Sequence, residues 1–181
     1  QDGLYAHYKA INDAVQLPIL VYNVPARTSV DISNATLARL AKLPNIIGIK
    51  DATGNIDRAC DLVARAPKDF ALYTGDDMTA MAFIMLGGHG TISVTANVAP
   101  RLMHEMCVAA RNGDIARARE IHFKLLGLHR DLFCEANPIP VKWAVQQMGL
   151  MPTGIRLPLT PLSEANQGRV LAAMRLAGVI A

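Results

Sequence analysis

The chain has 181 residues, of which 51% are hydrophobic and 18% charged, and its formal net charge is +3. This length and composition are typical of a folded protein with a buried core. The net positive charge is small and the sequence has no dense run of lysine and arginine, so we expect neither nucleic-acid nor membrane-surface binding. No apolar stretch reaches the ~18 residues of a membrane-spanning helix, and no signal peptide is visible.

In the first part of the chain, short apolar runs typical of buried strands alternate with segments of helical period. We expect one helix before the first strand, at residues 4–15, and one helix between each pair of successive strands, at residues 34–43, 56–65 and 78–86. We expect the strands at residues 19–22, 46–49, 70–73 and 91–94. Ser33 or Asn34 can cap the second helix, and Asn55 or Asp57 the third. Residues 23–28 and the other segments after the strands are expected to be polar loops.

Strands that alternate with helices predict an α/β protein with a parallel sheet. The polar loops at the carboxyl ends of the strands favour a TIM (β/α)₈ barrel, in which active sites lie on those loops. An open doubly wound sheet is the alternative, but no glycine-rich dinucleotide loop follows any strand. Residues 87–90 are glycine-rich but precede a strand, so we interpret them as a tight turn.

Beyond Pro100 the pattern predicts helices only, at residues 102–111, 115–134, 141–148 and 163–176. Ser163 is expected to cap the last helix, and residues 151–161 to form an extended connection. We predict two domains, a portion of a (β/α)₈ barrel at residues 1–112 and a helical appendage at residues 113–181. Because four strands are visible and a barrel has eight, the chain is expected to be the C-terminal half of a barrel plus its appendage.

The three cysteines lie far apart without metal-ligand spacing, so we predict free thiols and a cytoplasmic location. The histidines also indicate no metal site, and we expect His122 and His129 at a surface or an interface. The chain begins with Gln1 rather than methionine, from which we expect either processing or a longer parent protein.

Lys50 follows an apolar strand directly, where an unpaired lysine is unusual. One explanation is that its stem lies along the strand end while its ammonium group reaches water. The other is that a dry environment favours the free amine, which can attack a carbonyl carbon and form a Schiff base. The rest of the sequence must decide between these two explanations.

Tyr22 ends the preceding strand, so a parallel arrangement places it beside Lys50 at the same edge of the sheet. A tyrosine hydroxyl there can relay protons while a Schiff base forms. Arg27 lies in the loop after Tyr22 and can hold a substrate carboxylate through two parallel hydrogen bonds. The alternatives are a core tyrosine and a surface arginine.

Several motifs, in the same order, resemble the dihydrodipicolinate synthase (4-hydroxy-tetrahydrodipicolinate synthase) family over nearly the whole chain. They are YNVPART at 22–28, GIKDATGN at 48–55, GDD at 75–77, GGHGTISVTAN at 87–97 and NPIPVKWA at 137–144. The resemblance implies a TIM-barrel class I lyase of lysine and diaminopimelate biosynthesis, with pyruvate and aspartate 4-semialdehyde as substrates. It also implies a homotetramer formed by two tight dimers, and no metal or organic cofactor.

By the same resemblance, Lys50 forms the Schiff base with pyruvate and Tyr22 relays protons. Arg27 binds the carboxylate of the semialdehyde. Thr53, Gly75 and the backbone carbonyl of Ile92 line the lysine pocket.

The N-terminal part of the family has no counterpart here. That part carries the first four strands, a threonine of the proton relay, a tyrosine contributed across the dimer and the lysine feedback site. We therefore expect the longer parent protein to be the enzyme and this chain alone to be inactive. Two alternatives are a sibling pyruvate aldolase, such as N-acetylneuraminate lyase, and a non-catalytic assembly fragment.

Overall fold

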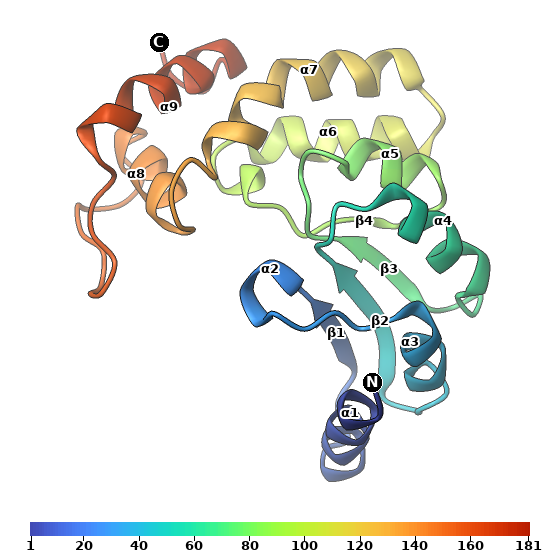
Figure 1. The fold of residues 1–181 in the computed structure, drawn as a ribbon. Coiled ribbons are helices and arrows are strands. Elements are labelled where there is room, and N and C mark those ends of the chain that lie inside the picture. Colours follow the sequence, from blue (N-terminus) through green and yellow to red (C-terminus); the bar gives the residue numbers. More distant parts are fainter. The chain divides into compact units, whose positions relative to one another are not determined.

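The computed structural model describes all residues 1–181, which form two compact units (Figure 1). Unit 1 is Gln1–Ile92 and contains every strand, whereas unit 2 is Ser93–Ala181 and is helical. The domain boundary expected after residue 112 stays a prediction.

Unit 1 is built on a parallel four-stranded sheet in which strands adjacent in sequence are also neighbours in space (Figure 1). The strands are β1 (Ile19–Asn23), β2 (Ile46–Asp51), β3 (Ala71–Thr74) and β4 (Gly90–Thr91). Its helices are α1 (Asp2–Ala14), α2 (Pro25–Thr28), α3 (Asn34–Leu40), α4 (Ile56–Arg65) and α5 (Ala80–Met85). The repeated strand–helix order and the parallel pairing confirm the predicted α/β class.

One face of the sheet packs into the hydrophobic core of unit 1. Side chains alternate between the two faces of a strand, and the residues that point into this core include Val21, Ile49 and Leu72. They are at most 3% exposed and pack with helix residues such as Leu37 and Leu62. Burial of these aliphatic side chains is the main force that holds the helices on the sheet.

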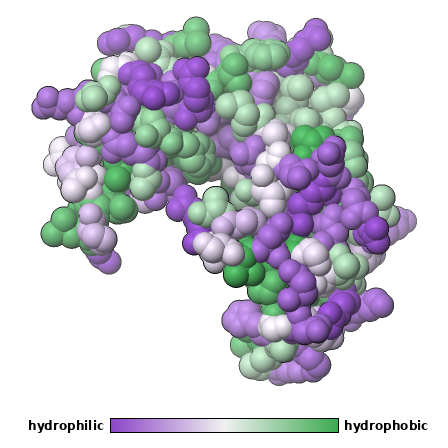
Figure 2. Space-filling model, viewed as in Figure 1, coloured by the Kyte–Doolittle hydropathy of each residue, from purple (hydrophilic) through white to green (hydrophobic).

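The opposite face of the sheet is open to solvent. Leu20 is 36% exposed and Tyr22 is 42% exposed, and Figure 2 shows hydrophobic side chains at the surface beside β1. Parallel sheets are normally covered on both faces. Further structure would therefore be needed to cover this face of the sheet.

Several local predictions differ from the structure. The second strand continues through Lys50 to Asp51, because the ladder with β1 extends to the pair Asn23 and Asp51. The fourth strand ends at Thr91, and the hydroxyl of Ser93 accepts a hydrogen bond from the Ala96 N–H, which turns the chain into a short 3-10 helix. The loop expected after Tyr22 contains a helical turn, α2, whose first residue is a proline.

The helix starts are set by polar caps. The Ser33 hydroxyl accepts a hydrogen bond from the Thr36 N–H, and the Asn55 side chain accepts one from the Arg58 N–H. Of the two alternatives offered for each helix, the structure thus selects Ser33 and Asn55. Ser163 precedes the last helix as expected, but its hydroxyl donates to Glu135 and does not cap that helix.

Unit 2 consists of helices packed around one long central helix. After the 3-10 helix (Thr95–Asn97) come α6 (Pro100–Arg111), α7 (Ile115–Asp131), α8 (Ile139–Gln147) and α9 (Glu164–Ala177). Helix α7 packs against both α6 and α9, with Leu125 and Leu128 fully buried. None of the helices in the chain combines the length and the apolar character that a membrane crossing requires.

Polar groups also anchor α7. The buried Asp131 carboxylate at its end accepts hydrogen bonds from Arg130 and Arg169, and these two guanidinium groups lower the pKa of Asp131. His122 and His129 were expected at a surface or an interface, which is wrong: they are 9% and 3% exposed, with ring centroids 5.3 Å apart. Burial lowers the pKa of His122.

The close approach of strands β1, β2 and β3 predicts that Gly48→Ala destabilises the protein. A methyl group there would lie 2.7 Å from Ala71 Cβ and 2.8 Å from Leu20 Cδ1, and would also meet the Ala71 carbonyl oxygen. We expect a loss of about 1–3 kcal/mol in the free energy of unfolding, measured by urea denaturation. The control is Gly168→Ala in α9, where nothing lies within 4 Å; a gain of about 0.5–1 kcal/mol is expected there. Equal stability of the two variants would contradict this packing.

Candidate active site

Tyr22 and Lys50 lie side by side at the carboxyl ends of β1 and β2. They are direct partners in the parallel register, and the Lys50 Nζ atom lies 4.1 Å from the centroid of the Tyr22 ring. Tyr73 of β3 is the partner of Lys50 on its other side. An ammonium group over a tyrosine ring is attracted by the π electrons, which holds the two side chains together.

Gly75 leaves room for the stem of Lys50. A Cβ atom at position 75 would lie 2.7 Å from Lys50 Cε and 2.8 Å from Ala52 Cβ, both far below normal contact distances. The Gly75 N–H donates to the Asp51 carbonyl oxygen over 2.8 Å, which fixes the backbone in this position. Any larger residue would therefore displace the lysine side chain or the strand end.

The other residues expected in the site are placed by local structure. Arg27 is an exposed residue in the last turn of α2 and takes part in no ion pair of the chain. Ile92 directly follows β4, and its N–H donates to the Thr74 carbonyl oxygen. The Thr53 hydroxyl donates to the Asp51 carboxylate over 2.5 Å. Of the predicted residues, the structure thus places Tyr22 and Gly75 against the side chain of Lys50.

A polar network that was not predicted from the sequence lies on the other face of the same strand ends. The Asp51 carboxylate is only 4% exposed and accepts hydrogen bonds from Asn23 Nδ2 at 2.9 Å and Arg58 Nε at 3.1 Å, besides the one from Thr53. The Arg58 guanidinium also donates to the Ile32 carbonyl oxygen at 2.6 Å. A buried carboxylate with several donors is the arrangement that buried charges require.

The sequence contains one signal that predicts this network, the position of Asp51. Asp51 directly follows Lys50, and adjacent strand residues point to opposite faces, so a charged residue had to enter the side covered by helices. Its partner Arg58 lies in the first turns of the next helix. A carboxylate that is forced into a core predicts a cation nearby.

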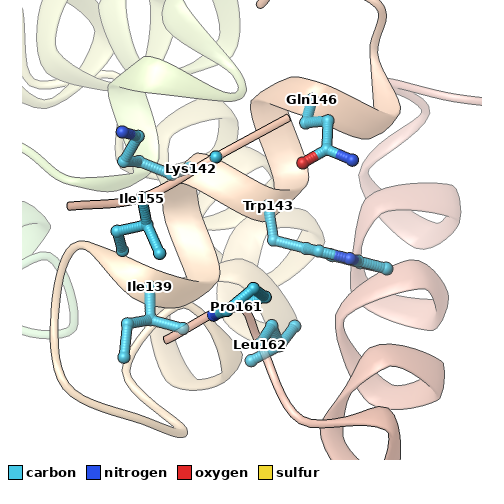
Figure 3. Close-up of a pocket in the computed structure, with 8 residues that line it drawn as sticks. Ile139, Lys142, Trp143, Gln146, Ile155, Pro161 and Leu162 are labelled. Atoms are coloured by element: carbon cyan, nitrogen blue, oxygen red, sulfur yellow. The ribbon is translucent and has the colours of Figure 1, made fainter. Parts of the chain in front are cut away.

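A separate pocket lies within unit 2 (Figure 3). Its lining residues come from α8 and from the connection and loop that precede α9: Ile139, Lys142, Trp143, Gln146, Gly154, Ile155, Pro161 and Leu162. Lys142 and Trp143 point in different directions in this view. None of the predicted site residues lines this pocket, and no group of three or more His, Cys, Asp or Glu side chains is placed to hold a metal ion.

The network predicts that Asn23→Ala costs stability. Asn23 is 1% exposed, donates to the carboxylates of Asp31 and Asp51, and accepts a hydrogen bond from the Ile32 N–H. Its removal leaves a buried N–H without an acceptor, so we expect a loss of about 1–3 kcal/mol in the free energy of unfolding. Gln16→Ala removes an exposed amide and is the control in urea denaturation. A loss no larger than that of the control would show that the network does not hold the strand ends.

The chain resembles known proteins in its family profile, its sequence and its structure. The profile of the Dihydrodipicolinate synthetase family matches residues 1–177. The chain is 77% identical over 181 residues to the 4-hydroxy-tetrahydrodipicolinate synthase of Dechloromonas aromatica, and 73% identical over 179 residues to that of Aromatoleum aromaticum. These alignments include 100% and 99% of this chain, but only 62% and 61% of the two relatives.

Solved structures agree with the sequence comparison. The crystal structure of a chloride-inhibited dihydrodipicolinate synthase from Acinetobacter baumannii, complexed with pyruvate, superposes with a TM-score of 0.96 at 53% identity. The match covers 99% of this chain and 62% of that protein. The α/β fold is therefore that of the TIM-barrel synthases, and the chain spans about three fifths of their length. On these grounds, the chain belongs to the dihydrodipicolinate synthetase family.

Proposed function

We propose that this chain is the C-terminal part of a 4-hydroxy-tetrahydrodipicolinate synthase, a lyase of lysine and diaminopimelate biosynthesis. The enzyme would condense pyruvate with aspartate 4-semialdehyde through a Schiff base at Lys50. The observation that carries the proposal is the pairing of Tyr22 with Lys50 at the strand ends of a chain from this family. The names of the relatives favour a synthase over a sibling aldolase such as N-acetylneuraminate lyase.

Lys50 is proposed as the nucleophile. Its free amine would attack the keto carbon of pyruvate to give a carbinolamine, which loses water to form the Schiff base. The positive nitrogen then withdraws electrons, so that a proton leaves the methyl carbon and an enamine forms. The enamine carbon would attack the aldehyde carbon of the semialdehyde and make the new carbon–carbon bond.

Tyr22 and Arg27 are proposed to assist these steps. Formation and collapse of the carbinolamine require proton transfers to and from oxygen, and the Tyr22 hydroxyl lies on the residue that is the direct partner of Lys50. Arg27 is exposed and free of ion pairs, so its guanidinium group can bind the carboxylate of the semialdehyde. Thr53, Gly75 and the Ile92 carbonyl are proposed to line the pyruvate pocket.

The rest of the barrel is proposed to complete this site. The open sheet face and the 62% coverage of the relatives both support a complement of further strands outside this chain. Without them, water reaches the Lys50 side of the sheet, so we propose that the 181-residue chain alone is inactive. We further propose a cytoplasmic homotetramer that needs no cofactor, with residues 1–112 in the barrel and 113–181 in the helical domain.

Substrate choice tests the proposal most simply. The intact protein, meaning this chain together with the proposed complement, should turn over pyruvate with aspartate 4-semialdehyde and not with N-acetylmannosamine. Arg27→Met should raise the KM for the semialdehyde by about 10–100-fold, because a hydrogen bond to a charged group is lost, and leave the KM for pyruvate unchanged.

The matched control is Arg65→Met, which removes an exposed arginine of α4 that pairs with Asp61. It should leave both KM values unchanged. Equal use of the two aldehydes would favour a sibling aldolase. An intact protein without turnover on either aldehyde would favour the non-catalytic alternative.

A further inference from the structure

The Asp51 carboxylate lies next to the proposed nucleophile, Lys50, in sequence but on the opposite face of β2. Asp51 follows Lys50 in β2, so the two side chains point to opposite faces of the sheet. Lys50 is partly exposed beside Tyr22, whereas the side chain of Asp51 is only 5% exposed. The carboxylate is therefore too far into the helix-covered side to touch a substrate on the Lys50 face.

Three separate segments donate hydrogen bonds to this one carboxylate. Asn23 ends β1, Thr53 lies in the loop after β2, and Arg58 lies in α4. Asn23 and Asp51 are register partners, directly after the register partners Tyr22 and Lys50. The hydrogen bond between the side chains of Asn23 and Asp51 therefore constrains the distance between Tyr22 and Lys50.

The backbone of Asp51 extends the same connection to β3. Its carbonyl oxygen accepts from the Thr74 hydroxyl at 3.2 Å and from the Gly75 N–H at 2.8 Å. Gly75 is the residue over which the Lys50 stem passes. Asp51 thus links the ends of β1, β2 and β3 at the level of the lysine.

The charge of Asp51 is balanced by Arg58. The Arg58 side chain is 12% exposed, and its guanidinium group divides its contacts among the Asp51 carboxylate, the Asp31 carboxylate at 3.5 Å and the Ile32 carbonyl oxygen. If the Asp51 charge is removed, this largely buried cation loses its nearest charged partner. It must then move toward water, and the helix end and strand ends must adjust with it.

We propose that Asp51 is a positioning residue, whose buried carboxylate, held by Asn23, Thr53 and Arg58, sets the spacing of Tyr22 and Lys50. This inference rests on the proposed function. Proton transfer between a tyrosine and a carbinolamine needs close alignment, and a misplacement of about 1 Å can lower a rate by about 100-fold. The ionised carboxylate, rather than the volume of the side chain, is the feature that the site requires.

Variants of Asp51 separate charge from size in the intact protein. Asp51→Asn keeps the size and removes the charge, whereas Asp51→Glu keeps the charge and adds one methylene group. We expect Asp51→Asn to lower kcat by about 100-fold with the KM for pyruvate changed by no more than about twofold. Asp51→Glu should recover most of that loss. Arg58→Gln tests the same ion pair from the helix side and should lower kcat as Asp51→Asn does.

The control is Asp57→Asn, which removes an exposed carboxylate beside Arg58 on the same helix and should keep wild-type kinetics. Circular dichroism and urea midpoints establish that each variant is folded at the assay temperature. If Asp51→Asn and Arg58→Gln are folded and retain wild-type kcat, or if Asp51→Glu is as slow as Asp51→Asn, the proposal is wrong. If the wild-type protein shows no turnover, the proposed function fails before this inference is reached.

Discussion

The parallel register of β1 and β2 is the constraint on which the candidate site depends. It pairs Tyr22 with Lys50 on the open face of the sheet and Asn23 with Asp51 on the face that the helices cover. A shift by one residue would exchange the two faces, burying the lysine and exposing the carboxylate. The polar network behind the sheet and the lysine–tyrosine contact in front of it are therefore two consequences of one arrangement.

Much of the fold could be predicted because its signals are local. Short apolar runs between helical segments located all the strands, and side-chain oxygens located the starts of α3 and α4 to within the alternatives offered. The pairing of Tyr22 with Lys50 followed from the strand ends alone. The roles of these residues, and those of Arg27, Thr53, Gly75 and Ile92, remain proposals.

The remaining features were not predictable because they depend on contacts between distant segments. The end of β4 at Thr91 depends on where its ladder with β3 stops, and the hydroxyl of Ser163 is diverted to Glu135 by tertiary packing. The buried positions of His122 and His129 depend on how α7 packs within unit 2. In each case local propensity was outweighed by tertiary structure.

The most direct test of the account is reduction of the intact protein with borohydride in the presence of pyruvate, followed by peptide mapping. A Schiff base that is reduced becomes a stable secondary amine, so its position can be read from the mass of one peptide. We predict a single pyruvate adduct, located on Lys50, and none in Lys50→Arg. An intact, folded protein without an adduct, or with its adduct on another lysine, would contradict the assignment of Lys50 as the nucleophile.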